Sequence, residues 1–390
     1  MVFGLVILKW ISPENMGLWN GVTIATPYIG LLQLGVFLAL NRELPYLIGK
    51  KKKEEAIENV QTVAFYSNLV SLIILIITSG FYLFYYFSSE NDLYLFTIIC
   101  FGISVALKAK QNYLVVTFRS HEDFKKLGYI YFGNIPVFAF AIILVIMYGY
   151  NGFLAGQILI PLILTASLYF KRPYKVRSTF FKKRFAKLLK TGIPFFVINY
   201  FHGLSPSFKK IALLSYLGSN ALGLFSPGLA ILAAGRFLPK IIGSFVYPKM
   251  SKKYGETDSK KSIWRMNLKS AIVAMFLAIP PAVLLYFSLP WLFDTFFPKY
   301  SEALDASSIV LISTVIAIPQ MMYNGLNSVK SYKSMILTVI LRLLIYWFVM
   351  IGVYHQIGGI IGLAWGIVAS DLIYTISVMV VTYYTLKLKQ

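Results

Sequence analysis

The chain has 390 residues, of which 58% are hydrophobic and 13% charged, and its formal net charge is +22. Soluble domains carry about 25% charged residues, so this composition excludes a soluble globular protein and predicts an all-α protein that crosses a membrane many times. The single cysteine, Cys100, and three histidines that lie far apart leave no residues for a disulfide framework or a metal site, and no cofactor is expected.

Apolar runs of bilayer-spanning length recur along the whole chain, since about 20 residues of helix cross the hydrocarbon core. We predict eleven spans, at residues 17–41, 62–88, 92–117, 128–148, 152–170, 192–217, 221–247, 268–293, 305–326, 334–354 and 358–386. A twelfth apolar run, residues 1–11, reaches only about 16 Å as a helix. We therefore expect roughly 10 to 20 further residues upstream of Met1, which would complete twelve helices.

Positive charge falls in alternate connections between these runs. The intervening connections contain one basic residue, Lys299. The positive-inside rule predicts that the basic connections and the C-terminus are cytoplasmic, in a multi-pass protein of a bacterial or archaeal plasma (inner) membrane. A nucleic-acid-binding surface would not alternate in this way, so no nucleic-acid partner is expected. Most of the 37 Lys and Arg residues lie at 42–53, 119–126, 171–190, 249–269, 330–333 and 387–389.

The longest basic connection, residues 171–190, separates two halves of the chain. Aromatic and leucine side chains alternate with Lys and Arg along its second part, which predicts an amphipathic helix on the membrane surface. We assign residues 1–170 to an N-terminal helix bundle, residues 171–190 to a cytoplasmic linker, and residues 191–390 to a C-terminal helix bundle.

The two halves share short motifs at one offset. Residues 11–19 align with residues 217–225 at an offset of 206, and Gly152 aligns with Gly358 at the same offset. This pattern predicts a duplication of two six-helix bundles that run in the same direction about an axis along the membrane normal. A central cavity is expected between the bundles.

Ionisable side chains inside the apolar runs mark the candidate site, because a charge at the bilayer centre costs at least about 2.5 kcal/mol on insertion scales. Such residues usually face a watery cavity. Asp371 lies at nearly the depth of Arg342, so we expect it to form an ion pair or to act as a coupling group. The alternative is that some cations, Lys240 and Arg42 especially, extend to the membrane interface. The expected cavity cations are Arg42, Lys209, Lys210, Arg236, Lys240 and Arg342.

Several stretches resemble one protein family. Residues 9–19, followed by Leu34-Gly35 and Leu40-Asn41-Arg42, are similar to the start of the polysaccharide and O-antigen flippases of the multidrug/oligosaccharidyl-lipid/polysaccharide exporter superfamily. The resemblance implies twelve helices around a V-shaped cavity, and flipping of undecaprenyl-pyrophosphate-linked sugar units. Lys209-Lys210 departs from the family pattern, which has an acidic or neutral polar residue in the seventh helix. Later landmarks of the same family are similar to residues 216–225, 247–252, 297–303 and 358–364.

Three classes of function follow from these features. A flippase would bind its substrate's phosphates in a cationic cavity, leave the polyprenyl tail among membrane lipids, and work beside a polysaccharide polymerase and glycosyltransferases. An ion-coupled multidrug or small-molecule exporter of the same superfamily would need intramembrane carboxylates, of which Asp371 is the one deep example. A membrane enzyme would need catalytic groups on a sizeable outer loop or in a His or Asp cluster, so we do not expect an enzyme.

Overall fold

The computed structural model describes residues 6–87, 92–121 and 123–388, except for the side chains of residues 195, 198, 199, 202, 205, 206 and 388. In this part of the chain it contains helices and no strands. Within these residues, eight helices are long and apolar enough to cross a membrane, or nine if the bent pair Pro13–Gln33 and Val36–Gly49 forms one span. This confirms the predicted all-α membrane architecture. Residues 1–5 of the first apolar run, most of the connection at 88–92, and Lys389 lie outside the described residues.

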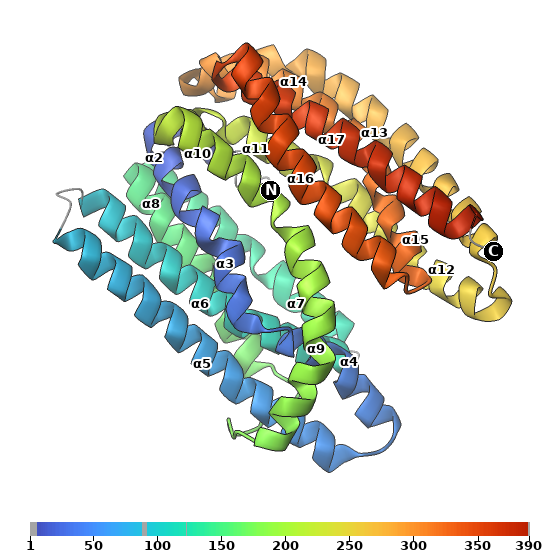
Figure 1. Cartoon of the computed structure of the whole chain (residues 1–390). Coiled ribbons are helices and arrows are strands. Elements are labelled where there is room, and N and C mark those ends of the chain that lie inside the picture. The colour runs from blue at the N-terminus through green and yellow to red at the C-terminus, as the bar shows by residue number, and fades with distance from the viewer. Residues whose placement is uncertain (1–5, 88–91, 122, 389–390) are drawn as a thin grey trace. The chain divides into compact units, whose positions relative to one another are not determined.

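One compact unit, unit 2, comprises Val22–Gly203. Helix α5 packs against α6, α6 packs against α8, and α4 packs against both α5 and α9 (Figure 1). Its core includes the fully buried side chains of Val36, Leu40 and Phe118. Its elements are η2(Thr23–Ala25), α3(Thr26–Gly30), η3(Leu31–Gln33), α4(Val36–Gly49), α5(Lys53–Tyr86), α6(Asp92–Ser120), α7(Phe124–Gly133), α8(Ile135–Phe170) and α9(Lys182–Gly203).

The other compact unit, unit 1, comprises Met1–Gly21 and Leu204–Gln390. The N-terminal segment therefore packs with the second half of the chain, and the Tyr300 hydroxyl donates to the Ile11 carbonyl at 3.1 Å. The two units do not begin and end at the same residues as the two bundles expected at 1–170 and 191–390. The division into those two bundles stays a prediction. Its elements are η1(Ile7–Lys9), α2(Pro13–Val22), α10(Ser205–Leu224), α11(Ser226–Gly235), α12(Phe237–Thr257), α13(Lys260–Phe296), η4(Pro298–Ala303), α14(Leu304–Ile316), η5(Ile318–Met322), α15(Tyr323–Ser328), α16(Tyr332–Ile357), α17(Gly359–Tyr383) and η6(Tyr384–Leu388).

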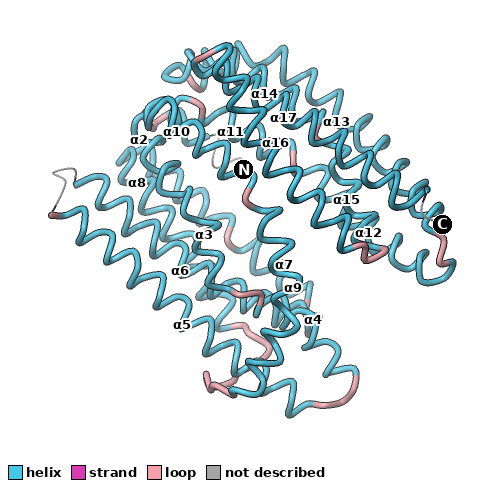
Figure 2. The backbone as a smooth tube through the Cα atoms, in the orientation of Figure 1, coloured by secondary structure: helices cyan, strands magenta, loops and turns pink. Residues whose placement is uncertain are grey.

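Glycines with positive φ make tight turns between apolar segments, as the short connections in Figure 2 illustrate. Gly149 (φ 57°) interrupts α8, Gly218 (φ 81°) interrupts α10, and Gly358 (φ 75°) separates α16 from α17. A continuous helix over Phe124–Phe170 would be about 70 Å long, more than twice the hydrocarbon thickness. The chain therefore folds back at Gly149, in agreement with the two predicted spans at 128–148 and 152–170.

The segments related by the 206-residue offset contact each other inside unit 1. A Cβ atom at Gly17 would collide with Ser219, and a Cβ atom at Gly223 would collide with Pro13. Asn20 Nδ2 donates to Ser226 Oγ at 2.9 Å, and these two residues are also 206 positions apart. Equivalent positions thus meet around a local pseudo-twofold relation, as expected for self-complementary contacts between duplicated segments.

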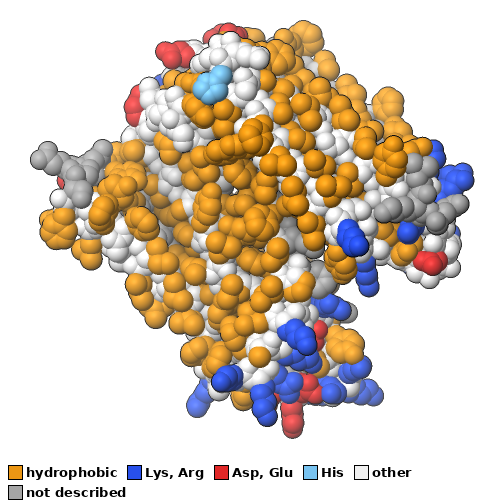
Figure 3. Space-filling model, in the orientation of Figure 1, with side chains coloured by type: hydrophobic (Ala, Val, Ile, Leu, Met, Phe, Trp, Pro, Cys, Tyr) orange, Lys and Arg blue, Asp and Glu red, His pale blue; other side chains and the backbone are white. Residues whose placement is uncertain are grey.

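The surface has the distribution expected of a membrane protein. Large apolar side chains cover the sides of the helices (Figure 3), and Phe276, Leu284 and Phe287 are more than 70% exposed. In unit 2, Lys and Arg gather at the end where α4, α5 and α9 meet (Figures 1 and 3). An apolar surface with basic ends suits lipid tails at the sides and head groups at the ends.

Candidate functional site

Helix α10 presents Lys209 and Lys210 to two different partners. Adjacent residues point about 100° apart on an α-helix, so the two ammonium groups cannot share one direction. Lys209 Nζ lies 2.9 Å from Asp371 Oδ2 on α17, and both residues are 2% exposed. Lys210 Nζ donates to Asn20 Oδ1 on α2 at 2.8 Å. The first lysine is therefore part of a buried ion pair, and the second joins the contact between the duplicated segments.

Asp371 is surrounded by donors from four elements. Besides Lys209, its carboxylate accepts hydrogen bonds from Ser313 on α14 and from Tyr346 on α16. Gln320 Nε2, on η5, donates to Asp371 Oδ1 at 3.2 Å. A buried charge is tolerated when it is paired and its lone pairs accept hydrogen bonds. These contacts connect α10, α14, α16 and η5 to the middle of α17.

Arg342 lies beside this ion pair, on α16. Its Cζ atom is 4.9 Å from the ring centre of Tyr374 and 5.7 Å from that of Tyr346, and the side chain is 5% exposed. Aromatic faces stabilise a desolvated guanidinium through cation–π attraction. From the sequence, Arg342 and Asp371 lie at nearly the same depth in the membrane, and we expected them to pair. In the structure the ion-pair partner of Asp371 is Lys209 instead.

Arg236 occupies the junction between α11 and α12, at the N-cap position of α12, and its side chain makes no capping hydrogen bond. It is half-buried, and its charge is within interaction range of both Lys209 and Asp371. A Cβ atom at Gly235, the last residue of α11, would collide with Thr314 of α14. Because glycine has no Cβ atom, the end of α11 can approach α14 closely. The guanidinium therefore belongs to the same electrostatic environment as the buried pair.

Lys240 lies one turn further along α12 and is exposed. It lines a pocket of about 270 Å³ together with Ser244, Tyr247, Asn324 and Asn327. The pocket combines one cation with amide and hydroxyl groups, which are the donors and acceptors that sugar hydroxyls require.

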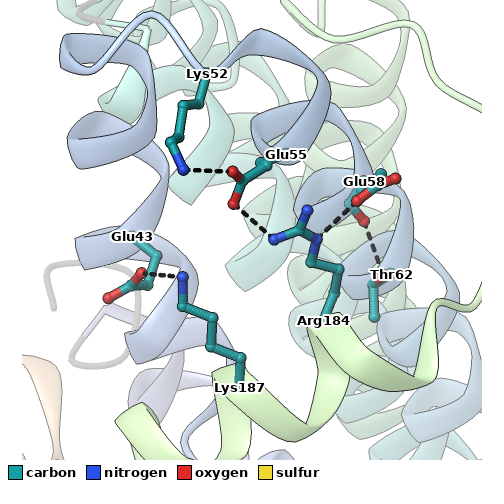
Figure 4. A network of polar contacts seen from close by, with 7 residues as sticks. All are labelled: Glu43, Lys52, Glu55, Glu58, Thr62, Arg184 and Lys187. Carbon is teal, nitrogen blue, oxygen red and sulfur yellow. Dashed lines mark hydrogen bonds and ion pairs between the residues drawn. The ribbon is translucent and has the colours of Figure 1, made fainter.

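Arg42, the remaining predicted cation, belongs to unit 2 and is exposed on α4. Its neighbour Glu43 forms an ion pair of 3.8 Å with Lys187 of α9 (Figure 4). On the same helix, Arg184 donates to Glu55 and Glu58 of α5 at 2.7 Å each (Figure 4). These carboxylates raise the pKa of Arg184, mainly through the hydrogen bond to Glu58. The start of α9, part of the predicted amphipathic linker, is thus held against α4 and α5.

Unit 1 therefore brings together Lys209, Arg342 and Asp371, with the charge of Arg236 in range, while Lys210 and Lys240 face other groups. Sequence reasoning missed Ser313, Gln320, Tyr346 and Asn20, because an uncharged polar residue in an apolar run does not reveal its partner. Among the described residues, no three His, Cys, Asp or Glu side chains are grouped to hold a metal ion.

Comparison with solved structures identifies the fold. The chain is similar to the inward-facing conformation of a multidrug resistance MATE family transporter of the MOP superfamily, with a TM-score of 0.79 and 14% identity over 99% of this chain and 94% of that one. It is also similar to a MOP superfamily transporter from Pyrococcus furiosus Vc1, whose reported reverse polarity of the binding pocket suggests a different function, with a TM-score of 0.64 and 16% identity over 99% and 91% of the two chains. At these identities the likeness concerns the fold alone.

No curated protein matches the chain. The sequence model described as "Polysaccharide biosynthesis protein" matches residues 11–304, which is most of the chain. The chain belongs to the polysaccharide biosynthesis protein family.

Proposed function

We propose that the protein flips undecaprenyl-pyrophosphate-linked oligosaccharide units across the cytoplasmic membrane, by alternating access, for the synthesis of a surface polysaccharide such as O-antigen, capsule or exopolysaccharide. The observation that carries this proposal is the set of cations in the membrane-embedded unit 1 of a polysaccharide biosynthesis family member. Cationic side chains suit the pyrophosphate that links the sugar to its polyprenyl carrier.

The cations have different tasks in this proposal. Arg236 is half-buried near the ion pair, and a guanidinium binds phosphate oxygens with two parallel hydrogen bonds. Lys240, in its pocket with Asn324 and Asn327, contacts the substrate's sugars. The charge of Lys209 is balanced by Asp371, so this pair holds the helices together rather than binding phosphate. The remaining cations add positive electrostatic potential for the anionic substrate; they are Lys210, Arg342 and Arg42.

The proposed setting follows from the substrate. Membrane lipids surround the apolar helices and the polyprenyl tail, and the basic connections face the cytoplasm of a bacterial or archaeal cell. Glycosyltransferases supply the lipid-linked oligosaccharide on the cytoplasmic side, and a polysaccharide polymerase uses it on the other side. No cofactor is required, because transport changes no covalent bond.

An ion-coupled exporter of drugs or other small molecules is the alternative, favoured by the likeness to a MATE transporter. Such a carrier needs a carboxylate that a mobile cation can reach. The contacts of Asp371 count against this role, because Lys209 already places a tethered cation 2.9 Å from the carboxylate and three further side chains donate to it.

Inactivating the gene in its own cell tests the proposal. Loss of the protein should remove the surface polysaccharide and leave the undecaprenyl-linked oligosaccharide on the cytoplasmic leaflet. Restoring the intact chain should reverse both effects. Unchanged surface polysaccharide, combined with raised sensitivity to cationic drugs, would favour the exporter.

A further inference from the structure

A second pocket lies in unit 2, whereas the pocket lined by Lys240 belongs to unit 1. It has a volume of about 570 Å³ and lies where α4 ends, α5 begins and α6 ends, and Tyr174 of the connection between α8 and α9 also lines it. This size is within the usual range of small-molecule sites. We call it the α4–α6 pocket.

One wall of the α4–α6 pocket is polar. Lys53, Ser120 and His121 line it, and none of the described lining residues is acidic. His121 Nδ1 lies 3.5 Å from Asp123 Oδ2, and its ring meets the Tyr174 ring edge-on with 5.7 Å between centres. The other ring nitrogen, Nε2, lies on the edge of the ring away from this contact and is the atom that could meet a ligand.

Ser120 has a hydroxyl without a hydrogen-bond partner among the residues that the structure describes. The residue is 6% exposed, and its Oγ atom makes no hydrogen bond. Thr117, three residues earlier on the same helix, satisfies its own hydroxyl by donating to the Leu114 carbonyl at 2.6 Å. A buried unsatisfied hydroxyl is costly, so a donor or acceptor supplied by a ligand would be stabilising here.

The other lining residues are mostly apolar, and some of them are exposed at the surface. Pro45, Ala56, Ile48 and Ile57 line the pocket, and the last two are 41% and 42% exposed. The nearby carboxylate of Glu55 is paired, because it accepts from both Lys52 and Arg184 (Figure 4). An anion next to an exposed apolar wall describes a phospholipid better than a soluble phosphate, which would make no use of that wall.

We propose that the α4–α6 pocket binds the head group of an anionic phospholipid, with Lys53, Ser120 and His121 as ligands of the phosphate and Ile48 and Ile57 in contact with the acyl chains. None of the residues that line this pocket is among the cations proposed to bind the transported substrate. Its occupant is a resident lipid rather than transported cargo.

The test uses the full chain, purified in neutral detergent and stripped of lipid. Phosphatidylglycerol, phosphatidylcholine and inorganic phosphate are titrated separately, with bound lipid counted by native mass spectrometry and the melting temperature followed in parallel. We expect phosphatidylglycerol to bind and raise the melting temperature, and the other two to do neither. An equal response to phosphatidylcholine, or a full response to inorganic phosphate alone, would overturn the assignment.

Three variants locate the site. Ser120→Ala should leave the lipid-free melting temperature unchanged or higher, because an unsatisfied hydroxyl is removed, and should weaken phosphatidylglycerol binding about tenfold. Lys53→Ala combined with His121→Ala should weaken it further. Lys125→Ala is the matched control, since it removes one exposed positive charge from the same unit outside the pocket. Wild-type binding by both test variants, or equal loss in Lys125→Ala, would refute the proposal.

Discussion

The ammonium of Lys209 lies 2.9 Å from a carboxylate oxygen of Asp371, 162 residues further along the chain, and both side chains are almost inaccessible. This ion pair joins α10 to α17, and the donors around Asp371 add α14, α16 and η5. Removing one partner of a buried pair leaves an uncompensated charge, which is far more costly than removing both.

We therefore predict that Lys209→Ala destabilises the protein by about 3 to 5 kcal/mol and lowers its level in the membrane. Lys209→Met combined with Asp371→Leu should recover most of this loss, because neither member of the pair is then left without its partner. Melting temperature in detergent and the amount of folded protein measure the effect. A double variant as unstable as the single one would show that the pair itself, and not charge balance, sustains the fold.

Gly17 and Gly21 on α2 provide a comparison within a single helix. A Cβ atom at Gly17 would collide with the Ser219 backbone, whereas a Cβ atom at Gly21 would meet nothing within 4 Å. Gly17→Ala should thus destabilise unit 1 by about 1 to 3 kcal/mol, the usual effect of overpacking. Gly21→Ala should be neutral or stabilising, since alanine favours a helix interior by about 0.5 to 1 kcal/mol. Equal melting temperatures for the two variants would argue against the close contact of the duplicated segments.

The proposed orientation is open to cysteine labelling in a background where Cys100 is replaced by alanine. The basic connections predict that cysteines at Asn220 and Gln356 react with an impermeant reagent from outside the cell. Cysteines at Thr179 and Glu256 should react only after permeabilisation. All four positions are exposed in the structure, so access depends on the side of the membrane. The reversed pattern would invert the orientation.

The helices and turns follow closely from the sequence, because apolar length and glycine position are local properties. The turns at Gly149 and Gly218 lie between predicted spans, and the 206-residue offset reappears as the contact between Asn20 and Ser226. Partner choice was harder to predict. Rise per residue gives the depth of a charge but not the face on which it lies, so depth alone pointed to Arg342 as the partner of Asp371, whereas the packing of α10, α16 and α17 gives Asp371 the partner Lys209.

The proposed transport role depends most on Arg236. Loss of one charge-assisted contact to phosphate reduces binding about 10- to 100-fold, so Arg236→Ala should lower the rate of substrate flipping by that factor. Arg236→Lys should keep partial activity, because lysine retains the charge but not the paired hydrogen bonds. Lys182→Ala, an exposed cation at the start of α9, is the control and should behave as wild type.

Flipping of an undecaprenyl-pyrophosphate-linked oligosaccharide by the intact protein in proteoliposomes is the most direct measurement of this account. The expected result is flipping by the wild-type protein and by Lys182→Ala, partial flipping by Arg236→Lys, and a loss of about 10- to 100-fold in Arg236→Ala at equal reconstitution. A wild-type protein that leaves this lipid in place while it exports a cationic dye, or an Arg236→Ala variant that flips at the wild-type rate, would contradict it.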